Sequence, residues 1–109
     1  IDNAIRNRRA DVSARDYSYL LAIKGMISGK RNRYDEAITR FNEAIEYDKH
    51  NALAFLERGK VLLATGKNSR AISDLRKASS LGEGEARDLL AEIDHDPAKV
   101  QGSRMVSNN

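Results

Sequence analysis

The sequence has no cysteine, only two histidines and a single proline among its 109 residues. The absence of cysteine excludes disulfide bonds, thiolate catalysis and cysteine-ligated metal sites. No apolar run is long enough to span a bilayer, and the start at Ile1-Asp2-Asn3 has no hydrophobic signal-peptide core. This start also lacks an initiator methionine, which predicts a processed product or a fragment of a longer chain. The compartment stays unknown, with the cytoplasm slightly favoured.

Signals for catalysis or metal binding are equally sparse. His50 lies in a polar stretch, and His95 lies within Asp94-His95-Asp96, which could mimic a metal cluster. One histidine with adjacent carboxylates does not supply the ligand set that a metal needs, so a polar helix end is the better interpretation. The serines are scattered without a partnering histidine, and no glycine-rich phosphate loop follows a strand. We therefore expect no enzyme, no cofactor and no metal site.

Charge gives nucleic-acid binding little support. Charged residues make up 32% of the chain, and acidic residues are interleaved with basic ones, so the net charge is only +3. The candidates for a basic patch are Arg6, Arg8, Arg9 and Arg15 in an N-terminal arm, with Lys30, Arg31 and Arg33 as further members. Asp2, Asp11, Asp16 and Asp35 dilute this patch. Nucleic-acid binding through the arm is therefore the least favoured alternative.

What the sequence does contain is a repeat with an interval of 34 residues. The units 18–51 and 52–85 also match in apolar character where they differ in residue type, as at Leu21 and Phe55. An interval of this length is typical of stacked helix-turn-helix units. The identical pairs are Gly25 and Gly59, Ala37 and Ala71, Ile38 and Ile72, and Ala44 and Ala78.

Periodicity and helix-end signals predict five helices. The first begins at an N-cap Asp16 and ends near 29, and Asn32 tolerates a left-handed turn conformation after it. The fourth is capped by Asn68 or Ser69 and ends before Gly82. The others are expected over 34–47, 52–64 and 85–94.

The glycines inside these helices predict a close approach of neighbouring helices. Gly25 and Gly59 each lie within a helical pattern. Glycine costs roughly 1 kcal/mol relative to alanine there, so close packing is the natural compensation.

In these residues the chain resembles the tetratricopeptide repeat family. That family places a small residue, an alanine, a large residue and a second alanine at fixed positions of each unit. The matching residues are Gly25, Ala37, Phe41 and Ala44 in the first unit and Gly59, Ala71, Leu75 and Ala78 in the second. The first inter-unit turn departs from the family in having Lys49 for the usual proline, and the second, over 82–85, departs further.

The resemblance implies an all-α fold, a short α-solenoid of antiparallel helix pairs. We expect an N-terminal arm or partial helix over 1–15, a repeat domain over 16–94 and a flexible tail over 95–109. The domain would hold the units 18–51 and 52–85 and a C-terminal capping helix over 85–94. If the ends of so short an array stay uncovered, self-association follows, which makes a structural assembly module the second functional hypothesis.

The resemblance also implies a protein–protein interaction scaffold that binds a peptide or helix of a partner on its concave surface. In the family, this surface is built mainly from the first helix of each unit. An apolar floor with a few cations would suit apolar anchors and acidic groups of a partner whose identity the sequence leaves open. The equally weighted alternative is that Leu53, Leu56, Leu63 and Leu90 simply pack locally. The candidate residues are Tyr19, Ala22, Met26, Lys30, Leu53, Leu56, Lys60, Leu63, Arg87 and Leu90.

One subclass of the family binds acidic C-termini of heat-shock chaperones through a carboxylate clamp. Its lysine and asparagine positions in the first unit are occupied here by Ala22 and Met26. The clamp is therefore not visible in this sequence.

Overall fold

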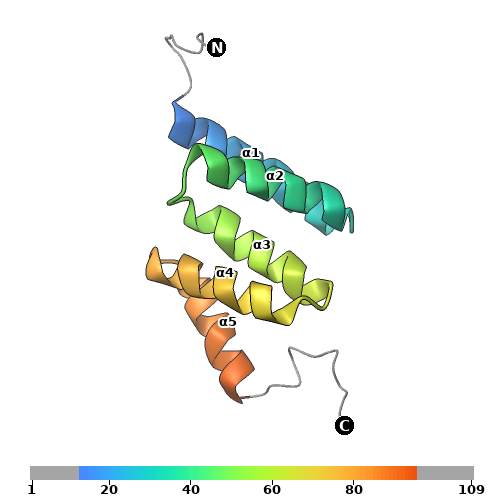
Figure 1. Ribbon diagram of the computed structural model, residues 1–109, viewed down its shortest axis with the longest axis vertical. Coiled ribbons are helices and arrows are strands. Elements are labelled where there is room, and N and C mark those ends of the chain that lie inside the picture. Colours follow the sequence, from blue (N-terminus) through green and yellow to red (C-terminus); the bar gives the residue numbers. More distant parts are fainter. Residues whose placement is uncertain (1–12, 96–109) are drawn as a thin grey trace.

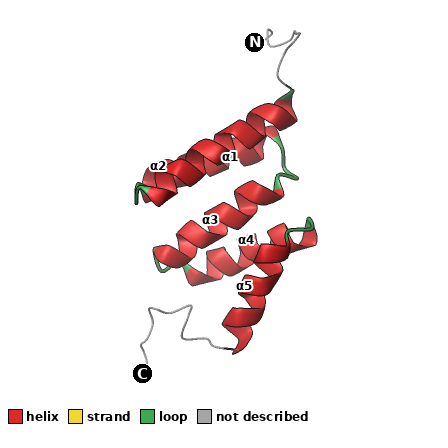
Figure 2. Cartoon of the chain, turned by 180° about the vertical axis from the view of Figure 1, so that it is seen from behind, coloured by secondary structure: helices red, strands yellow, loops and turns green. Residues whose placement is uncertain are grey.

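The computed structural model describes residues 13–95, which form an array of five α-helices without strands (Figure 1). Short loops connect the helices (Figure 2). Helices α1 and α2 form one antiparallel pair, α3 and α4 form a second, and α5 packs on the second pair. The all-α repeat architecture is therefore confirmed. The helices are α1 (Ala14–Lys30), α2 (Tyr34–Tyr47), α3 (Ala52–Ala64), α4 (Asn68–Ser80) and α5 (Gly84–His95).

Two helix starts differ from the sequence prediction. Ser13, not Asp16, is the N-cap of α1, because its Oγ accepts a hydrogen bond from the backbone N–H of Asp16 at 3.1 Å. Asn68 and Ser69 do not cap α4, whose N-cap is Lys67 and makes no side-chain hydrogen bond. Helix α1 thus includes two residues assigned to the arm. His95, assigned to the tail, is the last residue of α5. The rest of the arm, over 1–12, and the rest of the tail, over 96–109, lie outside the described residues.

The turns that end α1 and α3 share one backbone geometry. The turns inside the two pairs place Asn32 and Gly66 in the left-handed region, with φ of 62° and 81°. The next residues, Arg33 and Lys67, donate their N–H groups to a carbonyl of the preceding helix at 2.9 and 2.8 Å. This arrangement ends one helix and directs the chain into the next through the backbone alone.

The glycine repeated inside the helices permits the close approach that the sequence predicts. A Cβ added to Gly25 would lie 2.5 Å from Cε1 of Phe41, and one added to Gly59 would lie 3.0 Å from Cδ2 of Leu75. In each helix pair, a large side chain of the second helix, Phe41 or Leu75, therefore fills the space beside the glycine of the first helix. The repeated alanines are all 0% exposed: Ala37, Ala44, Ala71 and Ala78.

We expect Gly25→Ala to lower the free energy of unfolding by about 1–3 kcal/mol, because the new methyl group overpacks the core against Phe41. Urea unfolding followed by circular dichroism measures the change. Gly84→Ala is the matched control, since nothing lies within 4 Å of a Cβ at that position. Equal stability of the two variants would contradict the assigned packing.

A buried polar link holds α3 against the first pair. The hydroxyl of Ser18 donates to the carbonyl oxygen of Ala44 at 2.6 Å. Asn51 Nδ2 donates to the Ser18 hydroxyl at 2.7 Å, and its Oδ1 accepts from the N–H of Ala54 at 3.0 Å. One asparagine therefore caps α3 and joins it to α1, which sets the distance between the two first helices of the units.

Candidate functional site

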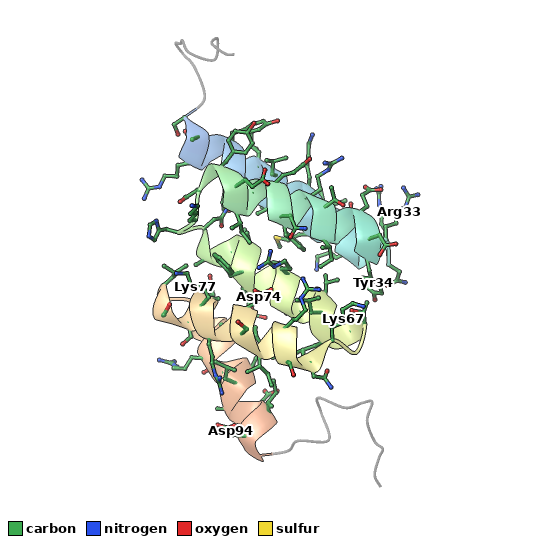
Figure 3. The ribbon with its side chains drawn as sticks, viewed as in Figure 1. Arg33, Tyr34, Lys67, Asp74, Lys77 and Asp94 are labelled. Carbon is green, nitrogen blue, oxygen red and sulfur yellow. The ribbon has the colours of Figure 1, made fainter. Side chains whose placement is uncertain are left out.

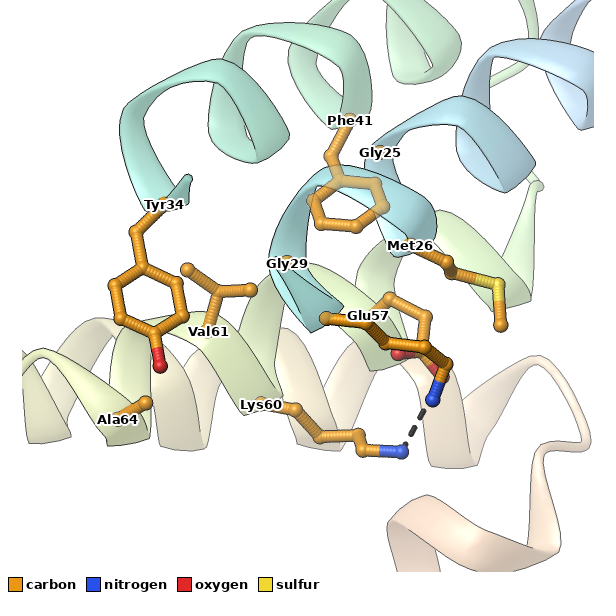
Figure 4. A pocket seen from close by; sticks show the side chains of 10 residues that line it. Gly25, Met26, Gly29, Tyr34, Phe41, Glu57, Lys60, Val61 and Ala64 are labelled. Atoms are coloured by element: carbon orange, nitrogen blue, oxygen red, sulfur yellow. Dashed lines mark hydrogen bonds and ion pairs between the residues drawn. The ribbon is translucent and has the colours of Figure 1, made fainter. Parts of the chain in front are cut away.

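A groove of about 180 Å³ lies between α1 and α3 (Figure 4). Met26 comes from α1 and Ala64 from α3, and Tyr34 stands at one end, at the start of α2. The two lysines that line it are Lys30 and Lys60. The other lining residues are Gly25, Gly29, Phe41, Glu57 and Val61.

The groove forms where α1 has a glycine in place of a residue with a side chain. Gly29 has no side chain, and Cγ2 of Val61 lies 3.5 Å from the place where its Cβ would be. Helices α1 and α3 therefore meet closely at this point, and the space beside Met26 stays open to solvent. The result is a shallow groove with apolar walls.

The two lysines of the groove differ in their electrostatic surroundings. The Lys60 Nζ lies 2.9 Å from Oε2 of Glu85 and 3.4 Å from Oε2 of Glu57. Burial lowers the pKa of Lys60, but the hydrogen bond to Glu85 and the charges of both carboxylates outweigh it, so the pKa is raised above 10.5. Lys30 is exposed and has no ion-pair partner within residues 13–95. Only Lys30 thus offers this groove an uncompensated positive charge.

Of the candidate residues from the sequence, Met26, Lys30 and Lys60 come together in the groove. The prediction that Ala22 and Leu56 face a partner is wrong, because they are 0% and 2% exposed. Each lies on the side of its helix that meets the next helix of the array. Ala22 packs with Leu21, Ala44 and Ala54, and Leu56 packs with Leu75, Ala78 and Ala86.

The remaining candidates lie outside the groove. Leu53, Leu63 and Leu90 are half-buried and pack against the core clusters, as the local-packing alternative predicts. Tyr19 is 55% exposed. Arg87 is exposed on α5, where its guanidinium lies 3.6 Å from the carboxylate of its neighbour Asp88.

Sequence reasoning did not name seven of the lining residues as site candidates, namely Gly25, Gly29, Tyr34, Phe41, Glu57, Val61 and Ala64. Tyr34 was overlooked because it begins the second helix of its unit, whereas the family resemblance directs attention to first helices. Glu57 carried a usable signal. It lies one helical turn before Lys60, a spacing at which oppositely charged side chains meet.

Other functional classes gain no support from the described part of the chain. No helix within residues 13–95 is long and apolar enough to cross a membrane. The same residues hold no group of three or more histidine, aspartate or glutamate side chains arranged as metal ligands. The arginines of the basic arm, Arg6, Arg8 and Arg9, lie outside the described residues, as does Asp96 of the possible metal cluster.

Comparison with known proteins gives one finding. The profile of a family described as "TPR repeat" matches residues 30–66. This segment holds α2, the inter-unit turn and α3, which is the second half of one unit and the first half of the next. No curated protein and no solved structure matches the chain.

Proposed function

Since this chain is a tetratricopeptide repeat protein, we propose that it binds a segment of another protein in the groove between α1 and α3. Repeats of this family are generally protein-interaction modules. The groove is about 180 Å³, below the roughly 300–1,000 Å³ of a site for a drug-sized molecule. It fits one or two apolar side chains of a peptide better than a whole small ligand.

The unpaired Lys30 beside the apolar walls carries the proposal. An apolar anchor of the partner would lie between Met26 and Tyr34, and an acidic residue near it would pair with Lys30. Lys60 contributes less, because Glu57 and Glu85 already compensate its charge. The proposed ligand is therefore a peptide or helix with one apolar anchor and a nearby aspartate or glutamate.

Selection from a random peptide library with the full chain as bait tests this ligand class. We expect the selected peptides to share an apolar residue close to an acidic one. The methyl group of Met26, which lines the groove, reports the location by NMR. Binding that leaves the Met26 methyl signal unshifted would place the peptide elsewhere and contradict the proposal.

Two substitutions test the contacts separately. We expect Met26→Glu to weaken binding of a selected peptide about tenfold or more, because it puts a carboxylate against the apolar anchor. Lys30→Glu should weaken it by about three- to tenfold, the range of one exposed or partly buried charge pair. Arg70→Glu, a charge reversal at an exposed position of α4, is the control and should change nothing. Isothermal titration calorimetry measures all three affinities, and an unchanged affinity of Met26→Glu would exclude the groove.

A further inference from the structure

The outward side of α1 carries an exposed stripe that the groove does not use. We call Asp16, Leu20 and Ile27 of α1, together with its C-cap Arg31, the α1 stripe. All four are exposed, and the two apolar members are 52% and 48% exposed. Their spacing places them on one helix face, opposite the buried residues of α1 that meet α2 and α3. No described helix lies beyond α1 at this end of the array (Figure 1).

The repeat shows what this face does in the second unit. At the interval of 34, Leu20 corresponds to Ala54 and Ile27 corresponds to Val61. Ala54 and Val61 are 0% and 8% exposed, because α3 packs this same face on the first helix pair. This helix face is therefore buried against another helix in α3. In α1, the same face carries larger apolar side chains and is exposed.

The other end of the described array is closed differently. Helix α5 turns Leu89, Leu90 and Ile93 toward the second pair. Its outer side carries charged residues such as Asp88 and Asp94, both exposed. Exposed apolar packing surface is thus concentrated at the α1 end.

We propose that the α1 stripe is a dimerisation surface that binds the same stripe of a second copy, with the two α1 helices antiparallel. The stripe has an acid at its N-terminal end, two apolar residues in the middle and a base at its C-terminal end. Antiparallel packing that sets Leu20 against Ile27 of the second copy also sets Asp16 against Arg31 of that copy. Every contact occurs twice, as a two-fold interface requires.

Charge supports a second copy over other occupants. Neither Asp16 nor Arg31 has an ion-pair partner among the described residues, so both carboxylate and guanidinium are available. In the dimer, Asp16 and Arg31 of each copy would both gain an ion-pair partner. Lys24, beside the middle of the stripe, is exposed.

Sedimentation velocity of the full chain over a roughly hundredfold concentration range tests the proposal. We expect a monomer–dimer equilibrium whose dissociation constant rises about tenfold or more in Leu20→Glu. A monomer at all concentrations would overturn the proposal. A dimer that Leu20→Glu leaves intact would overturn it as well, because the copies would then meet through another surface.

Charge reversal tests the antiparallel register. Asp16→Arg and Arg31→Asp should each weaken the dimer, and the double variant should restore it, because the two ion pairs form again with reversed sign. Arg70→Asp, a reversal remote from α1, should leave the dimer unchanged. Loss of dimer in the double variant would contradict this register. Recovery in the double variant excludes misfolding as the cause, since that variant also carries Asp16→Arg.

Discussion

We expect Phe41→Ala to lower the free energy of unfolding by about 3–5 kcal/mol. Phe41 is 0% exposed and is among the largest fully buried side chains. It packs with Ala37 of its own helix, Val61 of α3 and the backbone of Gly25 in α1. Two of these neighbours, Gly25 and Ala37, have too little side chain to fill the cavity.

This loss is large relative to the total free energy of unfolding. A domain of this size has a total stability of about 5–15 kcal/mol, so Phe41→Ala removes a substantial part of it. Urea unfolding followed by far-ultraviolet circular dichroism measures the change. Tyr19→Ala is the control for an aromatic side chain that is 55% exposed, and it should stay within about 0.5 kcal/mol of the original chain. A loss below about 1 kcal/mol for Phe41→Ala would show that the ring does not join the three helices.

The second large effect is expected at the ion pair inside the second helix pair. Asp74 lies on α4 (Figure 3), and its two oxygens accept from Arg58 Nε at 2.7 Å and from a terminal nitrogen of Arg58 at 2.8 Å. The other terminal nitrogen donates to Asn42 Oδ1 of α2 at 2.8 Å. The guanidinium also lies 5.5 Å from the ring centroid of Phe55. Arg58 therefore connects the two helix pairs through a charged group that is mostly removed from water.

Asp74→Ala should lower the free energy of unfolding by about 2–4 kcal/mol, because the guanidinium loses its carboxylate while its side chain is only 19% exposed. The remaining bond to Asn42 keeps the loss from being larger. The variant Asp74→Ala/Arg58→Met should be more stable than Asp74→Ala alone, since it removes the unpaired charge. Glu43→Ala breaks the exposed pair with Arg40 and should cost less than about 0.5 kcal/mol. Additive losses in the double variant would contradict a coupled pair.

The fold could be predicted because small residues recur at the positions where two helices must approach closely. Gly25 and Ala37 permit the approach of two helices, and the same residue types recur at Gly59 and Ala71. The bounds of α2 and α3, predicted from periodicity and helix-end signals, agree with the structure. The start of α1 was predicted wrongly, because serine and aspartate are equally good N-caps and the sequence has both, at 13 and 16.

The site could be predicted only in part, because helical spacing gives the direction of a side chain but not what covers it. Met26 and Lys60 proved to line the groove. Ala22 and Leu56, on adjoining positions of the same helices, proved to be buried by the next helix. For Ala22, this cover depends on the crossing of α1 and α3, which the hydrogen bond between Asn51 and Ser18 fixes across 33 residues. No local pattern reveals such a bond.

The order of packing along the chain has a consequence for how the molecule folds. The extensive contacts join only helices that are close in sequence: α1 with α2 and α3, α2 with α3, α3 with α4, and α4 with α5. Closing such short loops costs little chain entropy, which favours folding within about microseconds to milliseconds. Helix α3 has neighbours on both sides, whereas α5 has them on one. Amide hydrogens of α5 should therefore exchange before those of α3, so that the array opens from its C-terminal helix inward.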